Sequence, residues 1–431
     1  MKIIGIDIGT TSICGVVFDT DKKTIIKSRT LANNSFIKSD KSYEKIQNPE
    51  IIMNSVHKLL SHLGAESTSA IGFSGQMHGI VYTDENGCAV SPLYTWQDER
   101  AAAEYIDGIS YAEFLGCFAG YGLATDFYNA QNGIIPENAK HLCTIADYAV
   151  MQLCGLKKPL VHITNAASLG CFDIEQNCFK IDNPRLPDIT SEFAVAGKYN
   201  EIPVCVALGD NQASFIGSVS DADDALINIG TGSQISWLSD VPVNAYGVEN
   251  RPFDGEKYLA AGCALCGGRA FAMVEKLFRE IAALAADKKI DSYYPLIDKI
   301  LEEKYETSLS ADCRFCGTRN EPQLRGGIFN ISESNFTAAD IAFSVLCGMS
   351  DELYQMYKNG GKKAKMLVCS GNGIRKNNTL RRIVSQMFGC DIRIPLYEEE
   401  ASFGAALAAS VACGLNDNIF EACRMINYKE V

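Results

Sequence analysis

The stretch from 203 to 237 reads PVCVALGDNQASFIGSVSDADDALINIGTGSQISW and contains two apolar segments that each end in a polar turn. The first segment, Val204 to Leu208, is followed by a glycine and the lone carboxylate of Asp210. The second, Ala225 to Ile229, runs into Gly-Thr-Gly-Ser at 230–233. This stretch therefore places a candidate base and a candidate phosphate-binding turn on consecutive elements.

The second of these segments resembles the start of the chain. Residues 3–19 read IIGIDIGTTSICGVVFD and align with ALINIGTGSQISW at 225–237. Each copy has a strand rich in β-branched residues, a Gly/Thr/Ser turn and another strand, which is the pattern of a hairpin. Glycine permits close backbone approach, and exposed amides with hydroxyls can hold an anion. The repeat therefore predicts two related lobes, each with one phosphate-binding turn.

Length and charge bound the class of protein. The 431 residues are too many for one ordinary core, so we expect two lobes. Lys and Arg number 39 against 52 Asp and Glu, the net charge is -13, and no basic stripe is present, which disfavours a role on nucleic acid or an anionic membrane. No apolar leader or long uncharged apolar run is found, so we expect a cytoplasmic protein.

The 17 cysteines are odd in number and scattered through predicted strands and helices. This pattern predicts reduced thiols that act as small apolar side chains. Cys313 and Cys316 form a CxxC, as Cys263 and Cys266 do, and no histidine lies near either pair in the sequence. A strand is favoured there over a metal or redox role.

The first lobe shows strand and helix alternation with polar loops at strand ends. Pro49 follows a capping Asn48, and apolar residues continue at helical spacing as far as Leu63, before a strand over Ser69 to Phe73. That strand ends in Ser-Gly-Gln-Met-His-Gly at 74–79, and such loops bind ligands in open α/β sheets. Its glutamine and histidine can bond sugar hydroxyls, although a histidine in a turn is more often merely satisfied locally.

A second loop reads Thr-Trp-Gln-Asp-Glu-Arg at 95–100. An indole beside carboxylate and guanidinium groups suits a sugar, because the ring covers C–H surfaces and the charges bond hydroxyls. The alternative is a core tryptophan followed by a solvated charge run. Neither loop is diagnostic alone.

The second half has glycines at two helix entrances. Gly267 and Gly268 precede one apolar-faced helix, and Ser-Gly-Asn-Gly at 370–373 follows the strand Lys365 to Cys369. Each is a weak nucleotide signal by itself. Glu400 to Ala409 opens a helix of small residues that can pack closely.

These signals occur together in the order seen in one family. The motifs are DIGTTS at 7–12, GDNQ at 209–212, GTG at 230–232, SGNG at 370–373 with Asn377, and EASFGAALAA at 400–409. The chain resembles the FGGY carbohydrate kinases of the actin/hexokinase/Hsp70 superfamily. The resemblance implies a two-lobed α/β fold of the actin-like, ribonuclease H-like ATPase class, with the active site in the interlobe cleft. It implies an N-terminal lobe over 1–218 for sugar and the first phosphate loop, and a C-terminal lobe over 219–431 for the second loop and adenosine.

The resemblance also implies a reaction. It is transfer of the γ-phosphate of ATP, with Mg²⁺, to the terminal primary hydroxyl of a ketose by a monomer or homodimer. Segments such as 120–125 and 165–168 favour sedoheptulose, giving sedoheptulose 7-phosphate, whereas Gln-Met-His-Gly is shared with xylulose kinases and leaves xylulose or ribulose as alternatives. Two readings of other classes are a non-catalytic sugar or ATP sensor of the same fold and an actin-like polymer-forming ATPase.

Site residues follow by position in the matching motifs. Asp210 is implied as the general base, with a helix-capping aspartate as the alternative, and Asp7 as the residue that holds Mg²⁺ through water. The implied nucleotide contacts are Thr10, Thr11, Ser12, Thr231, Gly232, Gly267, Gly268, Gly371, Asn372 and Asn377. The implied sugar contacts are Gln76, Met77, His78, Trp96, Asp98, Arg100 and Asn211. The family pattern is contracted around Asn129 to His141, which either shortens a surface loop or reshapes the sugar pocket.

Overall fold

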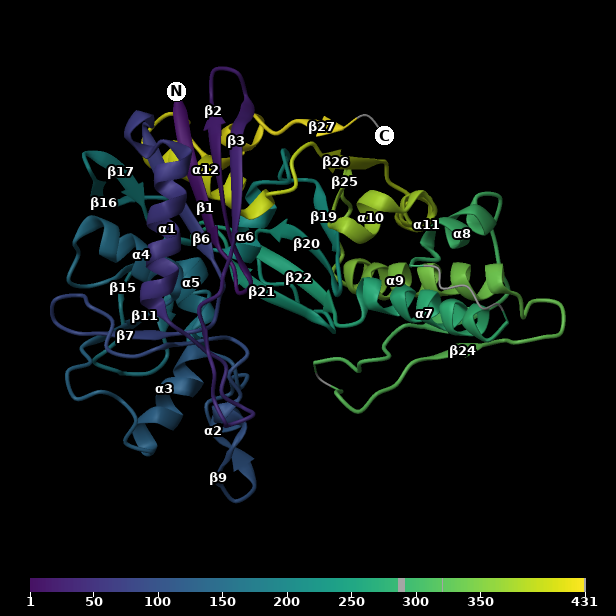
Figure 1. The fold of residues 1–431 in the computed structure, drawn as a ribbon, viewed down its shortest axis with the longest axis horizontal. Helices are drawn as coiled ribbons and strands as arrows, with labels where there is room; N and C mark the ends of the chain where they lie inside the picture. The colour runs from purple at the N-terminus through teal and green to yellow at the C-terminus, as the bar shows by residue number, and fades with distance from the viewer. Residues whose placement is uncertain (286–290, 320, 430–431) are drawn as a thin grey trace. The chain divides into compact units, whose positions relative to one another are not determined.

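The computed structural model describes residues 1–285, 291–319 and 321–429, and divides into two compact units (Figure 1). Unit 1 comprises Met1–Asp221, Arg251–Tyr258 and Glu399–Asn427, and unit 2 comprises Ala222–Asn250, Leu259–Glu398 and Tyr428–Val431. The predicted division at 218/219 therefore misses two segments that return to unit 1. Within the described ranges, the helices are all too short or too polar to cross a membrane.

Unit 1 is built on a mixed sheet with the strand order β16-β17-β6-β1-β2-β3, in which β18 also pairs with β6. The central strand β1 is antiparallel to β2 and parallel to β6. The strands are β1 (Lys2–Ile8), β2 (Ser12–Asp19), β3 (Thr24–Ala32), β6 (Ala70–Gly75), β16 (Val195–Tyr199), β17 (Ile202–Cys205) and β18 (Leu208–Gly209). The first predicted hairpin is thus the middle of this sheet.

Helix α1 (Pro49–Leu63) packs in the core of unit 1 and begins and ends where the sequence predicted. The Asn48 side chain accepts hydrogen bonds from the amides of the first turn, and Gly64 ends the helix at φ 76°. The other helices of unit 1 are α2 (Tyr111–Phe114), α3 (Gly122–Gln131), α4 (Ile145–Cys154), α5 (Ile163–Ser168), α6 (Asp210–Ile216), α12 (Glu400–Ala412) and α13 (Ile419–Cys423), with 3₁₀ turns at η1 (Ala65–Ser67) and η2 (Arg100–Ala102). Short strands complete the unit at β4 (Phe36–Ile37), β5 (Ile46–Gln47), β7 (Val81–Thr83), β8 (Leu93–Tyr94), β9 (Glu104–Ile106), β10 (Ile109–Ser110), β11 (His141–Cys143), β12 (Leu160–His162), β13 (Phe172–Asp173), β14 (Cys178–Phe179) and β15 (Asp188–Thr190).

The small-residue helix α12 lies directly on the unit 1 sheet. A Cβ added to Gly5 would lie 1.8 Å from the carbonyl oxygen of Ser402, and one added to Gly72 would lie 2.0 Å from that of Ala405. Glycine is therefore required on both strands, because any side chain would displace the helix backbone. The close packing expected from the sequence is confirmed.

Unit 2 repeats the arrangement with the strand order β21-β22-β20-β19-β25-β26-β27. Its strand β19 is antiparallel to β20 and parallel to β25, as β1 is to β2 and β6. Its strands are β19 (Ala225–Ile229), β20 (Ser233–Ser239), β21 (Val248–Pro252), β22 (Tyr258–Ala264), β23 (Ser310–Asp312), β24 (Gly327–Phe329), β25 (Leu367–Ser370), β26 (Ile392–Pro395) and β27 (Tyr428–Lys429). Its helices are α7 (Gly267–Ala285), α8 (Tyr294–Leu301), α9 (Ala338–Asn359), α10 (Asn372–Lys376) and α11 (Asn378–Phe388).

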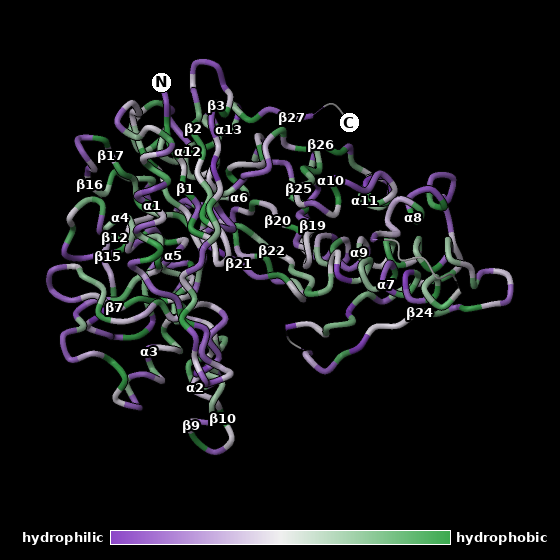
Figure 2. Tube along the Cα trace, viewed as in Figure 1, coloured by the Kyte–Doolittle hydropathy of each residue, from purple (hydrophilic) through white to green (hydrophobic). Residues whose placement is uncertain are grey.

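Each unit buries its own apolar core. The core of unit 1 joins α1 and α4 to the sheet, and that of unit 2 joins α9 and α11 to β19 and β25. Figure 2 shows the apolar residues along strands such as β17 and β22. The predicted duplication of an α/β lobe is confirmed.

Candidate active site

Two carboxylates lie where the central strands of unit 1 end. Asp7 is in β1 opposite Ser74 of β6, and Asp210 begins α6 directly after β18, whose Gly209 pairs with Gly75 of β6. Both therefore flank the end of β6, the edge of a parallel arrangement where ligands bind. The sequence placed these groups two hundred residues apart, and the pairing of β1 and β18 with one strand brings them together.

Burial controls the charge of both groups. It raises the pKa of Asp210 to about 7, the negative charge of Asp7 adds to this, and Arg251 opposes it. Burial also raises the pKa of Asp7 to about 6, against a hydrogen bond that the Ser74 hydroxyl donates at 2.8 Å. Two carboxylates that repel each other in this way suit proton transfer or cation binding.

The donor set fits a hydrated magnesium ion. Mg²⁺ usually keeps several waters and takes one or two carboxylates from the protein. Throughout the described part of the chain, no group of three or more His, Cys, Asp or Glu side chains is arranged to enclose a metal. Asp7, half-buried and of raised pKa, would gain from a nearby cation without a full protein cage.

Thr10 of the first hairpin turn is bonded to the predicted sugar loops. Its hydroxyl accepts a hydrogen bond from Trp96 Nε1 at 2.9 Å and donates to Gln76 Oε1 at 3.2 Å. Gln76 Nε2 donates to Gln47 Oε1 at 2.9 Å, and Gln47 Nε2 in turn donates to the Thr10 carbonyl oxygen at 2.8 Å. Trp96 stays 46% exposed, so its ring is open to a ligand. Gln47, which the sequence did not single out, completes the network. Of the other predicted phosphate contacts in this turn, Thr11 is exposed and Ser12 is half-buried.

His78 is held in a fixed orientation beside this network. Its backbone is in the left-handed region at φ 72°, and its ring stacks on Tyr121 with 4.4 Å between centroids. Its Nδ1 lies 2.8 Å from the Ser168 carbonyl oxygen, which can only accept, so Nδ1 carries the proton. In the neutral ring Nε2 is therefore the acceptor, a group suited to a sugar hydroxyl.

Met77 and Asn211 lie close to Asp210 by contact or by position in the chain. Met77 is buried, and its sulfur would lie 2.8 Å from a Cβ added at Gly209. Asn211 follows Asp210 in the first turn of α6 and is half-buried. Met77 is therefore in contact with Gly209, the residue that directly precedes the candidate base.

Asp98 and Arg100 form an ion pair with each other inside unit 1. Arg100 Nε donates to Asp98 Oδ1 at 2.7 Å, its Nη1 donates to Asn129 Oδ1 at 2.9 Å, and the guanidinium lies over the Tyr94 ring. Both side chains are 2% exposed or less. These two predicted sugar contacts are thus buried and paired with each other, and the contracted segment begins at the buried Asn129 that accepts from Arg100.

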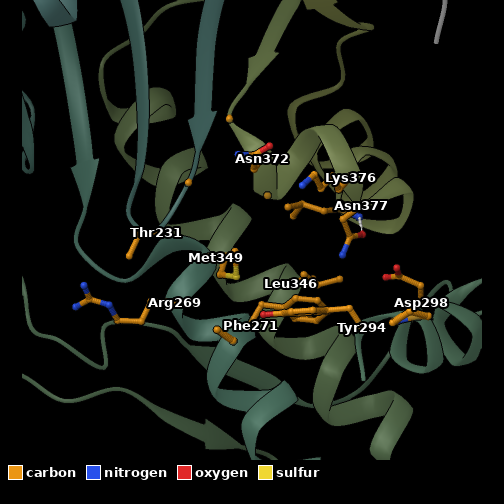
Figure 3. Close-up of a pocket in the computed structure, with 17 residues that line it drawn as sticks. Thr231, Arg269, Phe271, Tyr294, Asp298, Leu346, Met349, Asn372, Lys376 and Asn377 are labelled. Carbon is orange, nitrogen blue, oxygen red and sulfur yellow. Dashed lines mark hydrogen bonds between the residues drawn. The ribbon is translucent and has the colours of Figure 1, made fainter. Parts of the chain in front are cut away.

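Unit 2 contains a cavity of about 810 Å³ at its glycine turns (Figure 3). Figure 3 shows Thr231 and Arg269 on one side of it and Tyr294 and Asp298 on the other. The lining residues are Gly230, Thr231, Gly268, Arg269, Phe271, Ala272, Tyr294, Pro295, Asp298, Leu346, Met349, Gly371, Asn372, Gly373, Lys376, Asn377 and Leu380. The end of the cavity at Thr231 therefore offers main-chain groups and a hydroxyl, and its middle offers apolar and aromatic side chains.

The turn and the entrance of α7 are fitted together by backbone contacts. The Gly268 amide donates to the Gly230 carbonyl at 2.9 Å, and the Arg269 amide donates to that of Thr231 at 3.0 Å. A Cβ at Gly267 would lie 2.5 Å from the carbonyl carbon of Gly232. Gly232 and Gly267 therefore allow the turn and the helix to pack closely, and neither lines the cavity. Since the Gly268 and Arg269 amides are bonded within the protein, a phosphate at this turn would meet the Thr231 hydroxyl and main chain that glycine leaves uncovered.

The nucleotide contacts predicted in unit 2 therefore fall into two groups, those that line the cavity and the pair Gly232 and Gly267, which pack against each other. Thr231, Gly268, Gly371, Asn372 and Asn377 line the cavity. The Asn377 side chain also accepts from the Leu380 amide as the N-cap of α11.

Sequence reasoning missed several side chains of this cavity. Phe271 could have been found, because it lies on the apolar face of the helix that Gly267 opens. Tyr294 and Asp298 carry no comparable signal, since α8 lies in a stretch that the sequence marked only as polar.

Comparison with known proteins agrees with this geometry. The N-terminal domain of the FGGY family of carbohydrate kinases matches residues 2–110, and its C-terminal domain matches residues 225–413. The chain belongs to the FGGY family of carbohydrate kinases. This FGGY chain is accordingly an ATP-dependent carbohydrate kinase.

Individual relatives cover almost the whole FGGY chain. The sedoheptulokinase of Mus musculus is 27% identical, over 94% of this chain and 96% of its own. The xylulose kinase of Lactococcus lactis subsp. lactis is 24% identical, over 99% and 91%. The crystal structure of the xylulose kinase from Lactobacillus acidophilus has a TM-score of 0.83 at 19% identity, over 100% of this chain and 93% of that one. The expected actin-like kinase fold is confirmed.

Proposed function

We propose that this FGGY kinase transfers the γ-phosphate of ATP to the terminal primary hydroxyl of sedoheptulose, giving sedoheptulose 7-phosphate. The observation that carries the choice of sugar is the 27% identity to a sedoheptulokinase along 94% of the chain. A five-carbon ketose is the second candidate, because a xylulose kinase is 24% identical along 99% of it.

Asp210 is the proposed general base. With a pKa raised to about 7 by burial, it is ionised for much of the neutral range and basic enough to take a hydroxyl proton. Met77, which contacts the preceding Gly209, belongs to the loop that also carries His78, so we expect that loop to present a hydroxyl to the base. One base suffices, and His78 acts by hydrogen bonding.

The sugar is held by the exposed face of Trp96 and by polar groups around it. Gln76, His78 and Asn211 offer hydrogen bonds, and Met77 offers apolar contact. Asp98 and Arg100 act from behind, because their ion pair fixes the loop that presents the indole. A rigid aromatic face backed by an ion pair gives orientation at small entropic cost.

The cavity of unit 2 holds the nucleotide in this proposal. Bound ATP supplies the phosphoryl group, with Mg²⁺ to neutralise its charge. Phe271, Tyr294 and Met349 offer apolar surface for a base, while the Thr231 hydroxyl and the glycine amides suit phosphates. In unit 1, the turn of Thr10, Thr11 and Ser12 is a phosphate-binding turn by this proposal, and Asp7 would orient water bound to Mg²⁺.

The test is ADP release with Mg·ATP across sedoheptulose, D-xylulose, D- and L-ribulose, fructose and glycerol, with Asp210→Ala as the control. We expect the highest kcat/KM with sedoheptulose and loss of that activity in the variant. Preference for a pentulose would replace the substrate and keep the mechanism. Sedoheptulose phosphorylation that persists in the variant would refute the role of Asp210.

A further inference from the structure

The chain has two CxxC motifs, at 263–266 and 313–316, and the second cysteine of each lies beside that of the other. Cys316 lies with its sulfur 3.5 Å from that of Cys266, fifty residues earlier in the chain. Cys313 is buried, and its thiol is directed to the Val345 carbonyl oxygen at 3.4 Å. The sulfur pair in this part of unit 2 is therefore formed by Cys266 and Cys316.

The two thiols have unequal surroundings. Cys316 is partly exposed and accepts a hydrogen bond from Arg269 Nη1 at 3.5 Å, which together with Cys266 lowers its pKa. Cys266 is 1% exposed, and burial raises its pKa to about 11. A reachable thiolate beside a cation, next to a buried neutral thiol, is the arrangement of a reacting and a resolving cysteine.

The pair is connected to the cavity through the entrance of α7. Cys266 immediately precedes the two glycines that open this helix, and Arg269 lines the cavity on the Thr231 side (Figure 3). The Arg269 amide also donates to the Thr231 carbonyl. The residue whose guanidinium bonds the Cys316 sulfur is therefore also the one whose main chain holds the Thr231 turn.

We propose that Cys316 and Cys266 form a peroxide-reactive pair, and that its disulfide weakens nucleotide binding by unit 2. The second half rests on the proposed nucleotide cavity, and the first half stands without it. In the disulfide, the sulfur of Cys316 is neutral and turned to Cys266. The Arg269 side chain then loses the acceptor that positions it.

The chemistry needs only a hydroperoxide as oxidant. The Cys316 thiolate attacks one oxygen of hydrogen peroxide, the O–O bond breaks, and a sulfenic acid and hydroxide form. The Cys266 sulfur then attacks the Cys316 sulfur, the S–O bond breaks, and the thiol proton and one from solvent leave both oxygens as water. Two thiols lose two electrons and two protons in total, and one peroxide is reduced to two waters.

Peptide mapping tests the link directly. The full chain is treated with hydrogen peroxide, alkylated, digested and analysed by mass spectrometry. We expect one Cys266–Cys316 peptide, absent from Cys266→Ser and Cys316→Ser and present in the matched control Cys313→Ser. The sulfurs of Cys117 and Cys171 also lie 3.5 Å apart, so the link has to be assigned by mass. A Cys313–Cys316 or Cys263–Cys266 link, or no link at either Cys266 or Cys316, would overturn the proposal.

Calorimetry with Mg·ADP tests the consequence. Loss of one charge-assisted hydrogen bond predicts a Kd that is roughly threefold to tenfold higher for the oxidised protein and is restored by dithiothreitol, whereas peroxide should leave the Kd of Cys316→Ser unchanged. Unchanged affinity after complete disulfide formation would overturn the link to the nucleotide. Failure of the reduced protein to bind Mg·ADP would instead overturn the cavity assignment, and the mapping result would stand.

Discussion

The hairpin turns of the two units share one frame and differ by one charge. In unit 1, Asp7 of β1 accepts a hydrogen bond from the hydroxyl of Ser74 on β6 at 2.8 Å. In unit 2, Asn228 of β19 donates to the hydroxyl of Ser370 on β25 at 2.9 Å. The strand registers pair Asp7 with Ser74 and Asn228 with Ser370, so the two pairs occupy equivalent positions.

The chain continues differently after the two serines. After Ser74 and Gly75 it forms the loop that carries Gln76 and His78, whereas after Ser370 and Gly371 it forms α10 and lines the cavity. A carboxylate suits the side proposed to handle a proton and a cation. An amide suits a side proposed to face phosphates, because like charges would repel. The comparison teaches that one frame carries different side chains and loops in the two units, as two different proposed ligands require.

The largest effect is expected on the unit 1 side, at the candidate base. Asp210→Asn should lower kcat by on the order of 1,000-fold, since general base catalysis contributes that much, while Mg·ADP affinity stays unchanged. Steady-state ADP release and calorimetry measure both. Asp84→Asn, in an exposed hairpin turn of the same unit, is the matched control and should keep full activity. Turnover within tenfold of the unmodified protein would refute the role of Asp210.

Exchanging the differing pair is expected to give the next largest effect. Asp7→Asn should lower kcat by on the order of 100-fold while keeping the fold, because unit 2 shows that an asparagine fits this frame. The mirror change, Asn228→Asp, should leave the sugar KM unchanged and weaken Mg·ADP binding by roughly tenfold through repulsion of the phosphates. Equal loss of kcat in both variants would contradict the assignment of separate roles to the two turns.

The units also differ in how closely a helix approaches the sheet. Gly5 and Gly72 are neighbours on paired strands under α12, and the equivalent residues of unit 2 are Leu226 and Val368. Gly72→Ala should lower the free energy of unfolding by about 1–3 kcal/mol, because its Cβ would overlap the Ala405 carbonyl. Urea unfolding measures this, and Gly72→Ser should cost more. Two variants as stable as the parent would show that α12 can move away without cost.

The smallest effect concerns stability against pH. Burial raises the pKa of Asp210 from 3.8 to about 7, so the folded state binds the proton more tightly than the unfolded state. The resulting stability is complete below pH 3.8 and is lost as the pH rises through about 7. Asp210→Asn cannot ionise and so avoids this loss. Its free energy of unfolding at pH 8 should therefore exceed that of the parent by about 1 kcal/mol, a figure reduced because the site is partly exposed to solvent. An equal difference at pH 4 and pH 8 would exclude Asp210 as its cause.

Much of the frame could be predicted because its signals are local. The repeated strand, turn and strand pattern indicated both hairpins, and the capping Asn48 and Pro49 indicated the start of α1. Asp7, Asp210 and Thr231 could be named because their motifs lie in continuous stretches. Their neighbours Gln47, Tyr121 and Ser168 could not, since each meets its partner only through the fold.

The sequence by itself determined two related α/β lobes, their glycine turns and the residues of the main motifs, because hydrophobic periodicity and turn chemistry act over a few neighbouring residues. Only the tertiary structure decided that residues 399–427 return to unit 1, that Arg100 and Asp98 pair in the interior, and that Cys316 meets Cys266. These contacts join residues far apart in the chain or depend on which face of a loop is buried. Packing sets such contacts, and no local pattern records them.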